Sequence, residues 1–266
     1  MYLDPDWRIL TVGDGDFSFT RALTTRVNSS NLTGTVYDSE NVLRDKYRHN
    51  GIDDLRKQHI TLLFSFDVTD EACWQRLGDQ RFDVVIFQFP LLSQLGSRDA
   101  FESAKAAGGL NILNRALLHQ FLRNSARYAL DPKGAGLCYI TSKDVKPYSH
   151  WGLDHALTHH TPMHYVGEQP FDLKSFSRYK VRNVDRDKHV KDTLGITYSY
   201  ALSANALSEH CTRPYYLDHP NCCELCRAGP FKSERDKTNH LESKTHKHMQ
   251  HYAQLWQRWL TQYHGI

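Results

Sequence analysis

The sequence has no long apolar run, and this absence excludes membrane-spanning proteins of the helical kind. No stretch of roughly 18 consecutive apolar residues occurs, which is the length that a transmembrane helix needs. The mean hydropathy of −0.60 also indicates a polar surface. The first predicted strand begins as early as Ile9, so we expect no signal or transit peptide, and a precursor that has lost one is compatible with the sequence.

A strong charge bias is also missing. The chain has 33 Lys and Arg against 30 Asp and Glu, a formal net charge of +3, and residues 206–266 have 8 against 6. This near balance excludes a basic tail that binds nucleic acid by charge alone, although it leaves room for a local basic face. Neither an internal repeat nor a low-complexity segment is found.

Cysteines are few and unevenly spread. Two of the six, Cys73 and Cys138, are isolated, and the other four fall between residues 211 and 226. This pattern indicates a reduced compartment and a metal site rather than a disulfide framework. With 266 residues and 40% hydrophobic content, the chain is long enough for a large core. We expect a main domain over residues 1–205 and a smaller unit over residues 206–266.

Residues 8–23, RILTVGDGDFSFTRAL, carry the main nucleotide-binding signal. An apolar run is followed by Gly13, Asp14, Gly15 and Asp16 and then by a helical segment, which is typical of α/β folds that bind a nucleotide-like ligand. A Gly-Lys-Ser/Thr ending is missing, which excludes a P-loop. The two acids would repel a phosphate at the helix N-terminus, so a cofactor with hydroxyls and a positive centre, S-adenosyl-L-methionine, fits better. The alternative is a turn that merely joins strand to helix.

Strand and helix patterns alternate along the first 200 residues and predict an α/β fold with a parallel, doubly wound sheet. Residues 195–202 are expected to form a final antiparallel strand near the edge of that sheet. Residues 144–191 are expected to form loops and short helices over the carboxyl ends of the strands. The other predicted strands are 9–12, 33–37, 60–66, 82–87 and 136–141, and the predicted helices are 40–49, 71–77 and 112–129.

Acidic residues end two of the predicted strands, where ligands lie in such sheets. Asp38 suits a ribose diol because a carboxylate accepts two hydroxyl hydrogen bonds, and Asp67 is placed to accept from an adenine amine. Each alone is more often a loop acid or a helix cap. The residues predicted to contact the cofactor are Gly13, Asp14, Gly15, Asp16, Phe17, Ser18, Asp38, Ser39, Asp67 and Val68.

Six segments, in order, resemble the 25S rRNA (uridine-N3)-methyltransferase family of class I enzymes. They are GDGDFSF (13–19), YDSE (37–40), FDVVIFQFP (82–90), NRALLHQFLRNSARYAL (114–130), ITSKDVKPYSHW (140–151) and FDLKSFSRYKVRN (171–183). The resemblance implies a Rossmann-like fold, methyl transfer from S-adenosyl-L-methionine, rRNA as substrate and a part in ribosome biogenesis. It also implies the nucleus, nucleolus or cytoplasm, or the mitochondrion if a transit peptide has been removed.

The chain departs from that family at one loop. The family usually has Asn-Phe-Pro-His there, whereas this chain has Gln88, Phe89, Pro90 and Leu91. In class I nucleic-acid methyltransferases this loop holds the target base, so Gln88, Phe89 and Pro90 are catalytic candidates, with Phe89 able to stack on a base. The departure implies another target base, a moved catalytic site, or a non-catalytic RNA-binding or ribosome-assembly factor on the same fold.

Methyl transfer to uridine N3 is an in-line displacement in which the protein contributes mainly orientation. The N3 proton must leave, so a base or a stabilising cation is needed. Lys143 and Asp144, at the end of the fifth predicted strand, are the candidates for this role. The alternative is an ordinary exposed strand end.

A second motif predicts a metal. Cys223 and Cys226 are followed after thirteen residues by His240 and, six positions later, His246. Two thiolates and two imidazoles form a closed structural zinc (Zn2+) site, and the spacing resembles matrin-type zinc fingers, which act in RNA–protein assemblies. The sequence alone also allows Cys222 in place of Cys223 and His248 in place of His246.

Two features around this motif suggest partners. The first is a set of basic residues that can contact RNA phosphates or simply form a solvated face. The second is an apolar stripe at helical spacing that packs on the main domain or on a protein partner. The basic set is Lys232, Arg235, Lys237, Lys244 and Lys247, and the stripe is Tyr252, Leu255, Trp256, Trp259, Leu260 and Tyr263.

Overall fold

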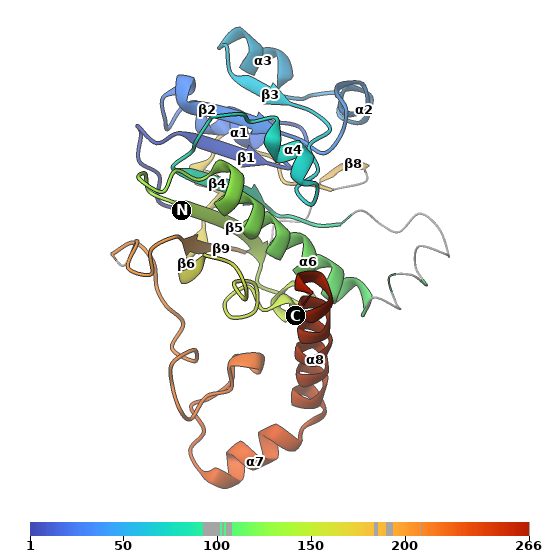
Figure 1. The fold of residues 1–266 in the computed structure, drawn as a ribbon, viewed down its shortest axis with the longest axis vertical. Coiled ribbons are helices and arrows are strands. Elements are labelled where there is room, and N and C mark those ends of the chain that lie inside the picture. The colour runs from blue at the N-terminus through green and yellow to red at the C-terminus, as the bar shows by residue number, and fades with distance from the viewer. Residues whose placement is uncertain are drawn as a thin grey trace.

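The computed structural model describes residues 1–92, 102, 104, 108–183, 186–189, 194–207 and 209–265. A seven-stranded sheet forms the centre of the molecule, with the spatial order β3-β2-β1-β4-β5-β9-β6 (Figure 1). The strands of this sheet are β1 (Ile9–Val12), β2 (Leu32–Thr35), β3 (Thr61–Leu63), β4 (Val84–Gln88), β5 (Leu137–Lys143), β6 (His164–Phe171) and β9 (Gly195–Ala201). A two-stranded ribbon joins β7 (Arg182–Asn183) to β8 (Arg186–His189).

The five strands β1 to β5 pair in parallel, and β9 runs antiparallel to β5. This arrangement confirms the predicted Rossmann-like, doubly wound α/β fold and its antiparallel last strand. The chain moves outward from β1 to β3 and then returns to place β4 on the other side of β1. Ligands of such sheets bind outside the carboxyl ends of the strands at this reversal point.

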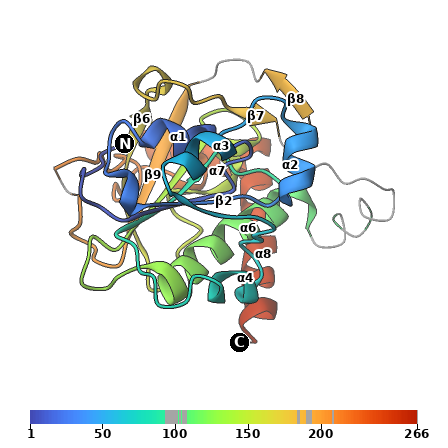
Figure 2. The ribbon, with the colours of Figure 1, turned by 90° about the horizontal axis from the view of Figure 1, so that it is seen from above.

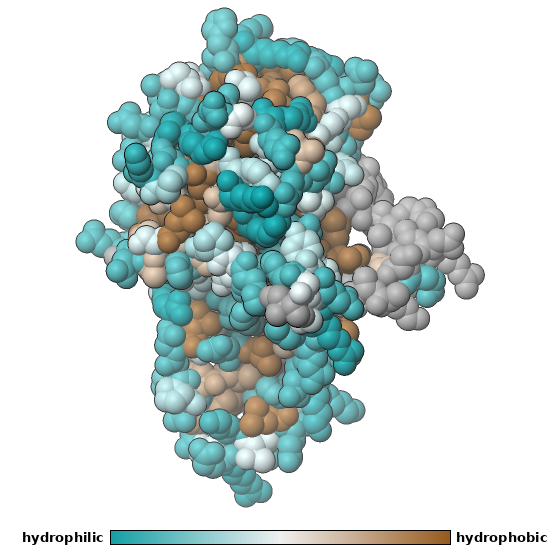
Figure 3. Space-filling model, viewed as in Figure 1, coloured by the Kyte–Doolittle hydropathy of each residue, from teal (hydrophilic) through white to brown (hydrophobic). Residues whose placement is uncertain are grey.

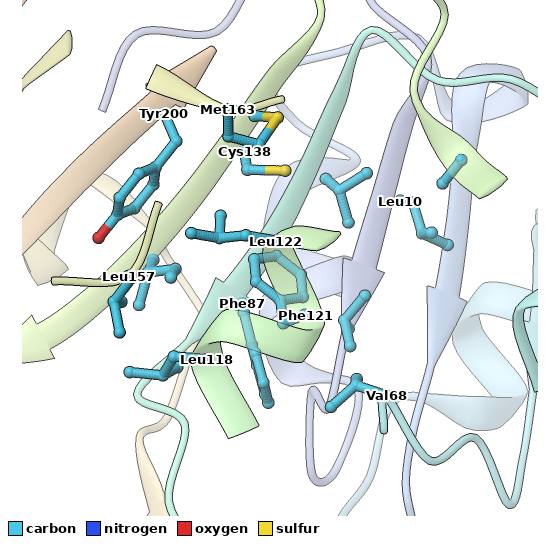
Figure 4. Close-up of a cluster of buried hydrophobic side chains, with 14 of the residues drawn as sticks. Leu10, Val68, Phe87, Leu118, Phe121, Leu122, Cys138, Leu157, Met163 and Tyr200 are labelled. Carbon is cyan, nitrogen blue, oxygen red and sulfur yellow. The ribbon is translucent and has the colours of Figure 1, made fainter. Parts of the chain in front are cut away.

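Helices cover both faces of the sheet because successive strand residues point to opposite sides. Leu10 and Val12 face a cluster with α4 and α6 (Figure 4), whereas Ile9 faces a second cluster with α1, α2 and α3. Figure 2 shows α1 and α3 on one side of the sheet and α4 and α6 on the other. The bounds are α1 (Ser18–Leu23), α2 (Glu40–Lys46), α3 (Ile52–Lys57), α4 (Glu71–Gln75) and α6 (Gly109–Asn124), the last continued by a π-helical turn, η2 (Ser125–Ala129).

The prediction for residues 144–191 was wrong in part. The segment holds two short 3-10 helices, η3 (Tyr148–Trp151) and η4 (Leu173–Ser175), but also β6, which pairs along the whole of β9 and forms the sheet edge. Polar residues alternate irregularly along β6 because one side is half-exposed, so the sequence shows no strand period there. Residues 184, 185, 190 and 191 of the segment lie outside the described residues.

The C-terminal part projects from the β6 side of the sheet and returns to it (Figure 1). It consists of a turn with a short 3-10 helix, η5 (Glu224–Cys226), followed by α7 (Glu234–Glu242) and the long α8 (Lys244–His264). The apolar stripe of α8 packs on α6 of the main domain: Trp256 and Leu260 are buried against Ile112 and Ala116. Among the described helices, none combines the length and the apolar character that crossing a bilayer requires.

Candidate functional site

A cavity of about 250 Å³ opens at the carboxyl ends of the parallel strands. Its walls come from the loops that follow β1, β2, β3 and β4, together with parts of α2, α6 and residues 179–182. Of the predicted cofactor and catalytic residues, the cavity is lined by Gly13, Asp14, Gly15, Asp38, Asp67, Val68, Gln88, Phe89 and Pro90. The marked ends of the first four strands therefore meet around one hollow.

The turn after β1 approaches the cavity as bare backbone. Gly13 and Gly15 have φ values of 61° and 64°, a region that disfavours side chains. A Cβ on Gly13 would lie 2.6 Å from Cε2 of Phe87, which is a residue of the cavity wall. Glycine at position 13 thus keeps both the turn and the adjacent wall in place.

Asp14 lines the cavity, but its carboxylate is already used by the protein. It accepts hydrogen bonds from the Phe19 amide at 3.0 Å and from the Thr20 amide and hydroxyl at 2.6 and 2.5 Å. Burial, together with the nearby Asp16 charge, raises the pKa of Asp14 to about 7. These contacts show that the Asp14 carboxylate holds the start of α1, because Phe17 at the helix cap offers no side-chain acceptor.

Asp16, Phe17 and Ser18 were predicted to contact the cofactor, and none of them lines the cavity. Phe17 is fully buried in the core. Asp16 pairs with Arg182 at 2.6 Å, and the Ser18 hydroxyl accepts from the Lys180 amide at 3.2 Å. These side chains tie the turn to residues 179–182, which we call the strap. The prediction fails here because these partners lie more than 160 residues away along the chain.

The acids after β2 and β3 are at the cavity wall. Asp38 forms an ion pair with Lys46 at 3.1 Å, and the Asp67 carboxylate accepts from the Thr69 amide and hydroxyl at 2.8 and 2.7 Å. Both retain further acceptor capacity, since a carboxylate has about four acceptor positions. Ser39 is not part of the wall, because its hydroxyl accepts from the Val42 amide and caps α2.

Gln88 is the most unusual side chain of the wall. It is 7% exposed, yet neither its amide oxygen nor its amide nitrogen has a hydrogen-bond partner among the described residues. A buried unpaired amide costs about 1–3 kcal/mol per group, which points to a ligand that supplies the missing partners. Phe89 follows at a φ of 47°, and its ring packs edge-on against Phe171 with centroids 5.7 Å apart.

Lys143 and Asp144 do not line the cavity, contrary to the prediction that they lie there. The Lys143 ammonium lies over the ring of Tyr148, 5.7 Å from its centroid. The Asp144 carboxylate pairs with Arg227 of the C-terminal part at 3.1 Å. The end of β5 therefore faces the C-terminal part, because β9 continues the sheet on that side.

Sequence reasoning missed the strap and the residues contributed by helices. Tyr179, Lys180, Val181 and Arg182 line the cavity, as do Lys46 and Tyr47 from the end of α2. The strap lies in one of the segments that carry the family resemblance, which is the only signal that singled it out. Its contact with the cavity depends on the Asp16–Arg182 pair and has no local sequence pattern.

Four predicted metal ligands come together in the C-terminal part. The ligand atoms of Cys223, Cys226, His240 and His246 all lie within 4.8 Å of one another. The Cys223 and Cys226 sulfurs lie 3.4 and 3.6 Å from Nδ1 of His246, and Nε2 of His240 is buried with no partner among the described residues. The structure selects Cys223 and His246 over their neighbours Cys222 and His248, which lie outside the cluster.

Comparison with known proteins gives one family. A family model described as "BMT5-like: rRNA (uridine-N3-)-methyltransferase BTM5-like" matches residues 10–183. An uncharacterized protein of Arabidopsis thaliana, At4g26485, is 32% identical over 149 residues, which are 55% of this chain and 68% of that protein. Heavy metal-associated isoprenylated plant protein 41 of Arabidopsis thaliana is 30% identical over 150 residues, and the chain spans only 27% of its length.

Solved structures with a similar arrangement include two from bacteria. The M1A22 tRNA methyltransferase TrmK of B. subtilis matches with a TM-score of 0.44 and 8% identity over 96% of this chain and 94% of that one. A cyclopropane-fatty-acyl-phospholipid synthase-like protein of Lactobacillus casei matches with a TM-score of 0.44 and 14% identity over 74% of this chain and 85% of that one.

Proposed function

Because the chain belongs to the BMT5-like rRNA (uridine-N3-)-methyltransferase family, we propose that it transfers a methyl group from S-adenosyl-L-methionine to N3 of a uridine in rRNA. The observation that supports this most directly is the cavity at the reversal point of the sheet, where glycine backbone, two acids and an unpaired amide face one space. A cofactor and a base can approach one another only in such a shared hollow.

The residues of the wall fit the cofactor. The Gly13–Gly15 backbone leaves room for its amino-acid end, Asp38 accepts from the ribose hydroxyls, and Asp67 with Val68 holds the adenine. When bound, S-adenosyl-L-methionine supplies a methyl group activated by its sulfonium. Asp38 is kept in place by Lys46, and the strap covers the cavity under the Asp16–Arg182 pair.

The target base is held at the Gln88 end of the cavity. The Gln88 amide nitrogen offers a donor that no described residue takes, and this donor matches a carbonyl group of the uracil edge next to N3, which leaves N3 itself free to react. The uridine N3 must lose its proton before it attacks. Lys180 of the strap now takes the role first assigned to Lys143, because it lines the cavity and its ammonium has no described partner, whereas Lys46 and Arg182 are paired with acids.

The C-terminal cluster fits Zn2+ as a structural metal that Cys223, Cys226, His240 and His246 hold. Zinc takes two thiolates and two imidazoles in a tetrahedron, and the unpaired buried Nε2 of His240 has no other acceptor or donor to meet among the described residues. The finger so formed, residues 219–246, and the first turn of α8 present basic residues to RNA phosphates. Of these residues, Lys232, Arg235, Lys244 and Lys247 are exposed, whereas Lys237 is half-buried and donates to the Pro220 carbonyl at 3.4 Å.

Cofactor binding is tested by calorimetry with S-adenosyl-L-methionine. Asp38→Ala is expected to weaken binding about 10- to 100-fold, which corresponds to the loss of hydrogen bonds to a charged group. Asp45→Ala is the matched control, because Asp45 is exposed on α2, the helix that follows Asp38, and does not line the cavity. No binding by the unaltered protein at millimolar cofactor defeats the proposal.

Methyl transfer is tested with rRNA and labelled cofactor. Gln88→Leu is expected to keep cofactor affinity while methylation falls, because the amide faces the base and not the cofactor. Nucleoside analysis of the product identifies the methylated position. Tight RNA binding with cofactor bound but no methyl mark supports instead the non-catalytic RNA-binding factor that the Gln88 and Leu91 replacements suggest.

A further inference from the structure

Arg227 belongs to neither the cavity nor the metal cluster, yet it connects the two parts of the molecule. It directly follows the metal-ligand candidate Cys226 at the tip of a tight turn closed by two backbone hydrogen bonds between Cys223 and Ala228, of 2.7 and 3.2 Å. Its own φ is 53°, and its side chain reaches two acids of the main domain, Asp144 and Asp154. Only 17% of this side chain is exposed.

The Arg227 guanidinium contacts three separate residues of the main domain. It lies 3.1 Å from the carboxylate of Asp144, 3.1 Å from that of Asp154, and donates to the Tyr198 hydroxyl at 3.3 Å. Asp154 is fully buried and also accepts from Tyr216 and His155. Although burial acts against ionisation, the His155 hydrogen bond and the Arg227 charge lower the pKa of Asp154 to about 2, so the pair is charged at neutral pH.

Strand β5 connects the contacts of Arg227 to the wall of the cavity. Gln88 at the end of β4 pairs with Thr141 of β5, and the Phe89 amide donates to the Thr141 carbonyl at 2.8 Å. Three residues further along the same chain, Asp144 meets Arg227. The loop that faces the target base and the tip of the finger are therefore fixed to the same strand.

A second attachment holds the other end of the C-terminal part. The Trp256 indole of α8 donates to the Ala156 carbonyl at 2.9 Å, and Leu260 is fully buried against α6. Attachment at two points prevents the finger from swinging freely, unlike a finger on a flexible linker. A rigid finger holds whatever it binds at one distance from the cavity.

We propose that Arg227 is a positioning residue that sets the finger at a fixed distance from the cavity, so that the substrate is a folded RNA whose helical segment contacts the finger while a nearby uridine enters the cavity. This inference rests on the proposed function. Single strands without a folded segment gain nothing from the finger, because they present no second site at that distance.

The test compares Arg227→Gln and Arg227→Lys with the unaltered full-length protein on two substrates, a folded rRNA fragment and a short single-stranded oligonucleotide with the same target uridine. Arg258→Gln is the matched control, because Arg258 is an exposed position of α8 outside the finger and forms no ion pair among the described residues. Zinc content and calorimetric cofactor affinity are measured first for each variant, and both are expected to stay unchanged.

For Arg227→Gln, kcat/KM on the folded RNA is expected to fall on the order of 100-fold, because a small misplacement of the reacting groups has such an effect. The value on the short oligonucleotide stays unchanged. Arg227→Lys does not restore activity, since one ammonium cannot reach three partners, and Arg258→Gln behaves like the unaltered protein. An equal fall on both substrates, or no fall on the folded RNA, overturns the inference, whereas an unaltered protein that methylates neither RNA overturns the proposed function instead.

Discussion

Backbone turns from four parallel strands enclose the cavity, whereas four side chains form the metal cluster in a segment with a small core. Every residue of β1, β2 and β4 is buried, but α7 of the finger has no buried residue. Figure 3 shows hydrophobic side chains at the surface of the lower part of the molecule, which holds the finger. We therefore expect the sheet to keep its cavity without a ligand, and the finger to depend on the proposed zinc and on its attachments.

The difference between the two regions predicts which of them collapses when zinc is lost. Cys226→Ser, or removal of zinc by a chelator, is expected to unfold the finger, because metal binding supplies about 10 kcal/mol or more in such modules. The main domain keeps its fold and cofactor affinity. Limited proteolysis and metal analysis measure the effect, and Cys222→Ser, outside the cluster, is the control. A finger that resists protease without zinc would show that its own packing suffices.

The main domain, in contrast, is expected to lose stability when the backbone conformation beside the cavity is changed. Gly13→Ala is expected to reduce the free energy of unfolding by about 2–5 kcal/mol, because it adds positive-φ strain and a clash with Phe87. Gly78→Ala is the control: its φ is 59° but nothing lies within 4 Å of the added Cβ, so only the strain of about 1–2 kcal/mol remains. Urea unfolding gives both values. Equal losses of stability at the two positions would mean that the Phe87 ring moves aside at little cost, so that its close contact with Gly13 is unimportant.

The contact between α6 and α8, which joins the two regions, is expected to lose stability in acid. His119 of α6 is fully buried, contacts the Leu157 carbonyl at 2.9 Å and meets His264 of α8 at 3.1 Å. Burial lowers the pKa of His119 to about 4, below its unfolded value near 6.5. Between these two pKa values the unfolded chain binds a proton at His119 and the folded chain does not. The contribution of His119 to the free energy of unfolding is therefore complete above pH 6.5 and declines as the pH falls toward 4, by up to about 3 kcal/mol.

Denaturant unfolding at pH 7 and pH 4.5 measures this decline. His119→Phe is expected to flatten this decline, whereas His251→Gln, at an exposed position of the partner helix α8, leaves it unchanged. If the free energy of unfolding of His119→Phe falls between pH 7 and pH 4.5 as much as that of the unaltered protein, another group is responsible for the acid sensitivity.

The sequence by itself determined where the parallel strands lie along the chain, which acids follow them, and the Cys223, Cys226, His240 and His246 set, with Cys222 and His248 left open as alternatives. Apolar runs such as FDVVIF report burial on both faces directly, and Cys and His at fixed spacing converge because short turns limit where they can go. Asp38, Asp67 and Gln88 were found because parallel strands all end at the same edge.

Only the tertiary structure decided what each polar group at that edge does. Asp14 and Asp16 look alike in the sequence, yet one caps α1 and the other pairs with Arg182, 166 residues away. Asp144 looked catalytic and instead joins Arg227, 83 residues further on. A carboxylate binds the nearest available donor in space, and that donor is fixed by the folding of the whole chain and not by the neighbouring residues.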